Sequence, residues 1–165
     1  MAVKSDKRIR RIIGEITELR DSSQVLSESG IYTYVDDSNV NNVYALLIGT
    51  SNTPYNKGYY FFKLTYPEEY PFKPPVAKYC TQGILTNDET KTSYHIRFNP
   101  NLYVCGKVCL SMLNTWTGPG WVPTNTISNV LVAIQALVLN ENPLINEPGY
   151  ESAPQKELKK YESMG

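Results

Sequence analysis

The chain has 165 residues, enough for one domain with a sizeable core. Its 16 basic and 16 acidic residues give a net charge of zero, which removes any global electrostatic reason to bind nucleic acid. No run reaches the roughly 18 apolar residues of a membrane helix, and the first residues lack the apolar centre of a signal peptide. We therefore expect a single domain over residues 1–165, with no nucleic-acid and no membrane partner.

The cysteines indicate the redox compartment. Cys80, Cys105 and Cys109 are odd in number and sparse, which does not suit a disulfide scaffold. Together with the absence of an export signal, they predict reduced thiols and a cytoplasmic or nuclear location.

Apolar residues near the N-terminus recur at helical spacing. They are Ile9, Ile12, Ile13, Ile16 and Leu19. The pattern predicts an amphipathic helix over about 4–20. Its other face is basic and carries Lys7, Arg8, Arg10 and Arg11. This face is either simply solvated or a docking surface for an acidic partner.

Three strand-like runs follow at 31–35, 43–49 and 58–66, rich in Tyr, Val, Ile and Phe. The polar turns between them are short, which predicts an antiparallel meander. The next stretch, 66–80, contains four prolines. Proline excludes a helix or an interior strand, so we expect a rigid loop that leads into an edge strand from about Val76.

A second helical stripe covers about 127–138, and Thr124 or Thr126 could cap its start. Two prolines and a glycine then interrupt the chain, and the tail can form one more short helix. Helices at both ends of a meander predict an α+β fold.

Cys109 has several possible roles. It could be a buried structural thiol. A hydrolase nucleophile would need a histidine, and His95 is the only one in the sequence, with no third group to orient it. Cys105 and Cys109 have a spacing that suits a metal, but no second pair completes a zinc site, so we expect no metal. The remaining role is a thiol that accepts an activated acyl group.

An acyl-accepting thiol needs access, an oxyanion donor and a positioned second nucleophile. Asn101 follows Pro100 in an Asn-Pro-Asn turn, eight residues before Cys109. A side-chain amide on such a rigid turn is a donor with little freedom to lose.

Three stretches in this order resemble the ubiquitin-conjugating enzymes: "PYNKGYYFFKLTYPEEYPFKPPV" (54–76), "RFNPNLYVCGKVCL" (97–110) and "WVPTNTISNVL" (121–131). The resemblance covers roughly residues 7–150. It implies an N-terminal helix, a four-stranded antiparallel meander, a long central helix and a short C-terminal helix. The longer segment after Cys109, with "TWTGPG" at 115–120, is similar to the larger Z-type and inhibitor-of-apoptosis-fused subgroup.

The resemblance also implies the reaction: Cys109 carries the modifier as a thioester, and Asn101 stabilises the oxyanion when a lysine attacks. Asn99 and Pro100 would support the turn. Most of the family has histidine where this chain has Asn99, and an asparagine amide can donate in a similar way. An acidic residue after the long helix would assist the lysine, which points to Glu147, with Glu141 and Glu151 as rivals.

The partners implied are ubiquitin or a ubiquitin-like modifier, an activating enzyme, a ubiquitin ligase and protein substrates. No cofactor is expected, because ATP is used by the upstream activating enzyme. Lys7, Arg8 and Arg11 would dock on the activating enzyme. The ligase would bind two loops through Phe72, Lys73, Pro123 and Thr124, for which ordinary loop packing is the alternative. The alternative function is a non-catalytic variant of the fold that binds a modifier or a partner.

Overall fold

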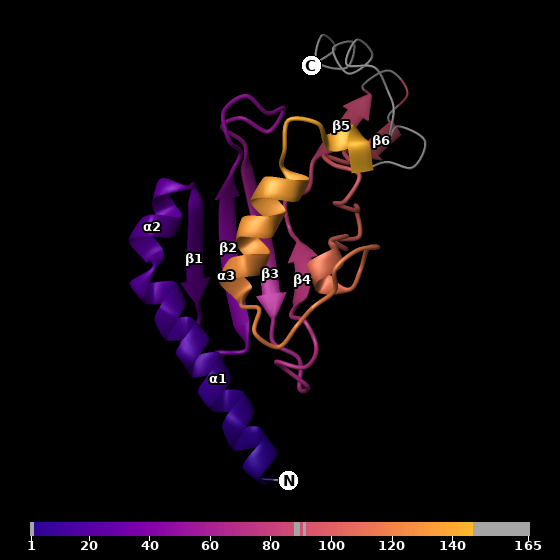
Figure 1. The fold of residues 1–165 in the computed structure, drawn as a ribbon. Coiled ribbons are helices and arrows are strands. Elements are labelled where there is room, and N and C mark those ends of the chain that lie inside the picture. Colours follow the sequence, from indigo (N-terminus) through magenta and orange to yellow (C-terminus); the bar gives the residue numbers. More distant parts are fainter. Residues whose placement is uncertain (1, 88–89, 91, 147–165) are drawn as a thin grey trace.

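The computed structural model describes residues 2–87, 90 and 92–146 (Figure 1). A four-stranded antiparallel sheet forms its centre, in the order β1-β2-β3-β4. The strands are β1 (Ile31–Val35), β2 (Asn42–Ile48), β3 (Tyr59–Thr65) and β4 (Val76–Tyr79). Each strand pairs with its neighbour in sequence, so the meander predicted from the short turns is confirmed.

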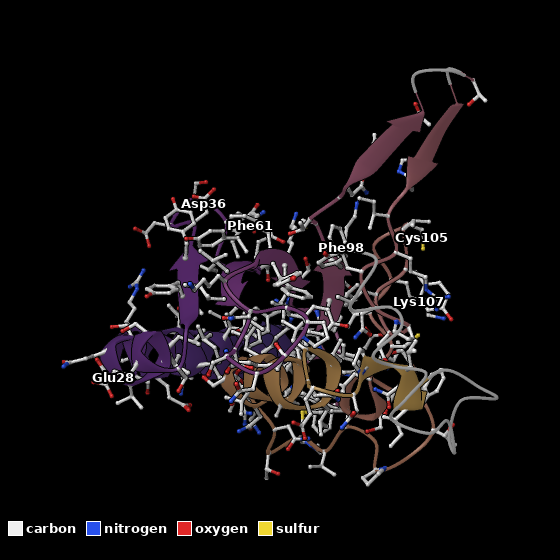
Figure 2. All side chains as sticks on the ribbon, turned by 90° about the horizontal axis from the view of Figure 1, so that it is seen from above. Glu28, Asp36, Phe61, Phe98, Cys105 and Lys107 are labelled. Carbon is white, nitrogen blue, oxygen red and sulfur yellow. The ribbon has the colours of Figure 1, made fainter. Side chains whose placement is uncertain are left out.

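Side chains of the sheet alternate between a buried and an open face. Val43, Ala45 and Leu47 of β2 are buried, and β3 contributes Phe62 and Leu64 to the same core. The opposite face is rich in exposed aromatic side chains: Tyr32, Tyr34, Tyr44, Tyr59 and Phe61. Figure 2 shows Phe61 on the side of the sheet away from α3 (Ile127–Ala133). One face of the sheet therefore packs against α3, and the other is exposed to solvent.

Two helices precede the sheet, α1 (Ala2–Asp21) and α2 (Ser23–Glu28). The predicted N-terminal helix corresponds to α1, in which Ile12, Ile16 and Leu19 are buried. The short helix α2 was not predicted, because six residues with a single buried side chain, Leu26, give no recognisable period.

The second predicted helix is wound in two ways. Its first half is α3, and its second half, Ile134–Val138, is a π-helix. The Leu139 N–H donates to the Ile134 carbonyl at 3.0 Å, five residues back. The cap is Thr126 rather than Thr124, since the Thr126 side chain accepts from the Asn129 N–H.

A second sheet was missed entirely. It is a hairpin of β5 (Ile84–Asn87) and β6 (Thr92–His95), and it projects from the body of the molecule (Figure 2). Its sequence is largely polar, so it shows no alternation that would predict strands. Two 3₁₀ helices, Ser111–Leu113 and Pro143–Asn146, complete the described elements.

The predicted C-terminal helix falls within 147–165, outside the described residues. None of the described helices is long and apolar enough to cross a membrane.

Candidate active site

Cys109 lies on a segment that pairs with the Asn-Pro-Asn turn. Leu102 and Val108 form an antiparallel bridge, and the Cys109 N–H donates to the Asn101 carbonyl at 2.8 Å. The predicted nucleophile and its predicted oxyanion donor are thus brought together. Cys109 itself is only 2% exposed, whereas Cys80 and Cys105 are exposed. The expectation of an accessible thiol is not met in this conformation.

Asn101 holds Cys109 through its side chain as well. Its Nδ2 donates to the Cys109 carbonyl at 2.8 Å, and the residue is 5% exposed. Its Oδ1 is buried with no hydrogen-bond partner. One of the two Nδ2 hydrogens is used in the contact with Cys109, which leaves the second for another acceptor.

Asn99 organises the turn through three hydrogen bonds. Its Nδ2 donates to the Tyr55 hydroxyl at 2.6 Å and to the Val138 carbonyl at 2.7 Å. Its Oδ1 accepts from the Asn101 N–H at 2.7 Å. A neutral histidine offers one donor and one acceptor, so it could not make all three bonds. The asparagine is therefore matched to its surroundings rather than being a loose substitute for histidine.

Two neighbours of Asn99 were not foreseen from the sequence. Val138 ends the π-helix, where its carbonyl accepts the bond from Asn99. Tyr55 precedes β3, and burial raises the pKa of its hydroxyl to about 12. Both groups are neutral at ordinary pH, so the turn is held by uncharged hydrogen bonds. The apolar pattern of a short π-helix looks like that of an α-helix. The bond from Asn99 to the Val138 carbonyl could therefore not be predicted from the sequence.

Thr115 clamps the residues on either side of Cys109. Its hydroxyl donates to the Val108 carbonyl at 2.7 Å and accepts from the Leu110 N–H at 2.9 Å. Thr115 begins the "TWTGPG" segment, which the sequence marked only as a subgroup feature. The structure gives that segment a local role in holding Cys109.

The predicted docking residues of α1 differ in their surroundings. Lys7 is exposed. The Arg8 guanidinium is half-buried and donates to the Pro67 and Tyr66 carbonyls and to Asn41 Oδ1. These bonds tie α1 to the loop after β3 and to the turn before β2.

Arg11 is likewise half-buried and serves the fold. Its Nη2 donates to the Asn125 carbonyl at 2.8 Å, and its Nε donates to Glu15 Oε1 at 2.6 Å. Both guanidinium groups, those of Arg8 and Arg11, therefore have structural partners. The sequence analysis considered only a solvated face or a docking surface for these residues. The structure shows a third role, hydrogen bonds within the protein.

The predicted ligase-binding residues are on the surface. Phe72 is 79% exposed, and Lys73, Pro123 and Thr124 are also exposed. Lys73 Nζ forms an ion pair with Glu69 at 2.7 Å. An aromatic ring so open to water is not packed in its loop, which argues against the loop-packing alternative for Phe72.

Trp121 connects the two predicted ligase loops. Its Nε1 donates to the Pro71 carbonyl at 2.6 Å, and Pro71 directly precedes Phe72. The backbone N–H of Trp121 donates to Asn114 Oδ1 at 2.9 Å. The loop of Phe72 and the loop of Pro123 are therefore held against each other.

Glu15 is a buried carboxylate that joins three elements. Besides Arg11, its Oε1 accepts from the Tyr70 hydroxyl at 2.5 Å, and its Oε2 accepts from the Ile127 N–H at 3.1 Å. Burial, followed by the bond to Glu15, raises the pKa of the Tyr70 hydroxyl well above its usual range. This role could not be predicted from the sequence, because Glu15 sits in an amphipathic helix among apolar residues.

Glu147 and its rival Glu151 lie outside the described residues, and Glu141 is exposed. His95 is exposed on β6. Within the described part of the chain, no three His, Cys, Asp or Glu side chains gather as a metal site would need.

Residues 11–163 match the family model "Ubiquitin-conjugating enzyme". The chain belongs to this family. Its resemblance to the Z-type subgroup is confirmed by "Ubiquitin-conjugating enzyme E2 Z" of Danio rerio and of Homo sapiens, each 42% identical over 134 residues. The match covers 80% of this chain and 38% and 35% of those proteins. The chain thus spans little more than a third of the length of these relatives.

A second kind of relative is the human "Dual E2 ubiquitin-conjugating enzyme/E3 ubiquitin-protein ligase BIRC6", 40% identical over 151 residues. The match covers 89% of this chain and 3% of that protein. Among solved structures, human ubiquitin-conjugating enzyme E2 G1 has a TM-score of 0.53 at 25% identity, covering 72% of this chain and 89% of its own. A Plasmodium falciparum ubiquitin-conjugating enzyme has a TM-score of 0.57 at 22% identity, covering 76% and 93%. Both support the fold of this family.

Proposed function

We propose that this chain accepts ubiquitin, or a ubiquitin-like modifier, as a thioester on Cys109 and passes it to a lysine or to a ligase cysteine. The observation that carries the proposal is the pair of 2.8 Å hydrogen bonds between Asn101 and Cys109. They hold the only cysteine of the "GKVCL" motif beside a buried amide donor. Membership of the family supplies the reaction class.

The reaction proposed has two balanced exchanges. First, the Cys109 thiolate attacks the modifier's C-terminal thioester on the activating enzyme, and that enzyme's cysteine leaves as a thiolate. Second, an amine attacks the new thioester carbonyl, an isopeptide bond forms, and the Cys109 thiolate leaves while the amine loses a proton. ATP is consumed by the activating enzyme upstream, so the chain itself needs no cofactor.

Asn101 would stabilise the oxyanion of the second exchange. The donor must lie close to the carbonyl oxygen as charge develops there. Asn101 Nδ2 already binds the Cys109 carbonyl, which keeps this amide close to the residue that would carry the thioester. Asn99 and Pro100 would act as turn support, through the hydrogen bonds of Asn99 with Tyr55 and Val138.

The attacking lysine also needs help, because an amine with a pKa near 10.4 is only about 0.04% neutral at pH 7. We assign Glu147 as the acidic residue that orients this amine or accepts its proton, by its place directly before Pro148. Glu141, which is exposed, and Glu151 are the other candidates.

The proposed activating enzyme and ligase bind through α1 and two loops. The basic face of α1 would meet the activating enzyme, chiefly through Lys7, since Arg8 and Arg11 also anchor α1 to the body of the protein. A ligase would take Phe72 and Lys73 from one loop, and Pro123 and Thr124 from the other. Exposed aromatic side chains on rigid loops make strong anchors. We place the protein in the cytoplasm or nucleus, where its cysteines stay reduced.

The test is a charging reaction. The chain is mixed with ATP, ubiquitin and each of a panel of activating enzymes, and the products are separated with and without a reducing thiol. The proposal predicts an adduct of one modifier's mass that the thiol removes. If no activating enzyme and no modifier of the panel gives this adduct, the chain is the non-catalytic variant instead.

A further inference from the structure

Three lysines lie side by side across the edge of the main sheet. Lys63 on β3 is the register partner of Lys78 on β4, and Lys78 faces Lys107 in an isolated antiparallel bridge. Directly opposite side chains on antiparallel strands are about 5 Å apart at Cβ, so like charges there repel. The described residues provide no carboxylate that forms an ion pair with any of the three. Within the described part of the chain, this row of positive charge therefore has no ion-pair partner.

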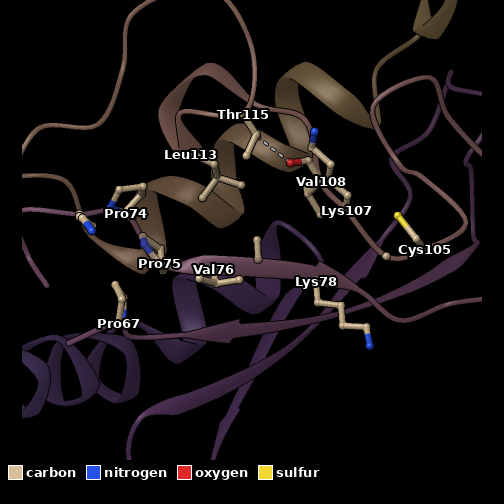
Figure 3. Close-up of a pocket in the computed structure, with 13 residues that line it drawn as sticks. Pro67, Pro74, Pro75, Val76, Lys78, Cys105, Lys107, Val108, Leu113 and Thr115 are labelled. Carbon is tan, nitrogen blue, oxygen red and sulfur yellow. Dashed lines mark hydrogen bonds between the residues drawn. The ribbon is translucent and has the colours of Figure 1, made fainter. Parts of the chain in front are cut away.

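A groove of about 500 Å³ lies beside this row (Figure 3). One wall comes from the proline-rich loop and β4, including Pro75 and Val76, and the other includes Val108 and Leu113. Val76 is 62% exposed, so the groove presents bare apolar surface to water. None of its lining residues is acidic. An apolar floor with a cationic rim suits an extended peptide that carries both an apolar and several acidic side chains.

The groove shares a wall with the segment of Cys109. Val108 directly precedes Cys109, and Thr115, which also lines the groove, bonds to Val108 and Leu110. Figure 3 shows the bond from Thr115 to Val108 within this wall. A peptide in the groove would therefore lie beside the residue that is proposed to carry the modifier.

Two of the three lysines that line the groove, Lys78 and Lys107, each have a close neighbour in the fold. The stem of Lys78 passes over Gly106, where an added Cβ would lie 2.9 Å from Lys78 Cγ. Gly106 has φ +90, a backbone conformation that favours glycine. Lys107 Nζ lies 5.8 Å from the centroid of the Tyr103 ring, within reach of a cation–π contact.

We propose that this groove binds an acidic segment of the protein that receives the modifier. An apolar side chain would rest against Val76 and Leu113, and carboxylates beside it would face Lys78 and Lys107. The assignment rests on the proposed function, because it names the class of acceptor: a lysine near an apolar residue and several Asp or Glu residues.

Binding is measured first on the protein that carries no modifier, by fluorescence anisotropy at low ionic strength. The probe is a short fluorescein-labelled peptide with a central lysine, one leucine and several aspartates. Matched peptides replace the aspartates by asparagine or the leucine by serine. The acidic, leucine-containing peptide should bind tightest, and added salt should weaken it. Lys78→Glu and Lys107→Glu should each weaken it about fivefold. Lys57→Glu makes the same charge change at an exposed lysine outside the groove and should leave binding intact.

The apolar part has its own control. Val76→Ser should weaken the leucine peptide and leave the serine peptide unchanged. Equal affinity for all the peptides, or an equal loss with Lys57→Glu, would overturn the proposal. So would equal affinity for an oligonucleotide of similar charge, because the site would then respond to charge alone.

Transfer is measured next, on chain that already carries the thioester. Discharge to the lysine of the acidic peptide should be faster than to the asparagine version, and Lys78→Glu should remove that preference. If a thioester forms but both peptides discharge it alike, the groove proposal is wrong and the proposed function stands. If no thioester forms, the proposed function is wrong, and the anisotropy series still decides whether the groove selects acidic peptides.

Discussion

Asn101 and Cys109 are joined twice, by the Cys109 N–H to the Asn101 carbonyl and by Asn101 Nδ2 to the Cys109 carbonyl, both at 2.8 Å. The backbone of the residue whose sulfur would carry the thioester is therefore fixed to the turn that carries its oxyanion donor. A donor that is already oriented needs no reorganisation when negative charge develops. The Nδ2 hydrogen that does not bind Cys109 is the one left for this task.

Replacing Asn101 by alanine should affect transfer far more than charging. Loss of one oxyanion donor typically slows the affected step by about 10²–10³. The buried Cys109 carbonyl also loses its side-chain donor, which should lower the free energy of unfolding by about 1–3 kcal/mol. Single-turnover discharge of pre-charged protein to lysine and urea unfolding measure the two effects. Normal discharge together with failed charging would assign Asn101 another role.

Replacing Asn99 by histidine should destabilise the protein, although histidine is the commoner residue of the family here. One imidazole donor cannot serve both the Tyr55 hydroxyl and the Val138 carbonyl while the ring accepts from Asn101. We expect a loss of about 1–3 kcal/mol in the free energy of unfolding. In a Tyr55→Phe background one of those acceptors is gone, so the same substitution should cost less. A cost equal in both backgrounds would show that Tyr55 is not the partner that matters.

Both main helices could be predicted because their apolar residues recur at helical spacing, and the main sheet because its strands are rich in Tyr, Val, Ile and Phe between polar turns. The run 43–49 is largely apolar, and only the structure shows that Val43, Ala45 and Leu47 are its buried members. The β5–β6 hairpin could not be predicted, because its sequence is largely polar and has neither a helical spacing nor a long apolar run. The π-helix was hidden for the opposite reason, since Ile134 and Val138 keep the spacing of an ordinary helix.

Removing the Glu15 carboxylate should be strongly destabilising. Glu15→Ala leaves the Arg11 guanidinium, the Tyr70 hydroxyl and the Ile127 N–H without their acceptor. Breaking a buried pair on one side costs about 3 kcal/mol. Glu18→Ala, an exposed site on the same helix, is the matched control and should change little. Urea unfolding compares them, and similar losses for the two variants would contradict a bridging role for Glu15.

The candidate site could be predicted only as far as its motifs reach. Cys109, Asn101 and Asn99 lie within ten or so residues of one another, so local sequence marks them. The Tyr55 hydroxyl and the Val138 carbonyl bond to Asn99 but come from segments 44 and 39 residues away. Their contacts arise only when the chain folds, and a backbone carbonyl carries no sequence signature at all.

The burial of Cys109 predicts an order of thiol reactivity. A thiol reagent needs access to the thiolate. Cys80 and Cys105 are exposed and should react quickly, whereas Cys109, at 2% exposure, should react at least about tenfold more slowly. Mass-resolved alkylation of the native protein gives the three rates, and Cys109→Ala should remove the slow phase alone. A Cys109 that reacts as fast as Cys105 would mean that the segment opens freely in solution.

The central claim is that Cys109 carries the modifier, and the chemistry of its linkage tests this most directly. Wild-type protein, Cys80→Ala, Cys105→Ala and Cys109→Ser are each charged with ubiquitin, ATP and an activating enzyme, then treated with a reducing thiol. We expect thiol-sensitive adducts on the first three. We expect a thiol-resistant, alkali-sensitive adduct on Cys109→Ser, because an oxygen ester replaces the thioester. A thiol-sensitive adduct that persists in Cys109→Ser, or disappears in Cys105→Ala, would place the modifier on another cysteine and contradict the account.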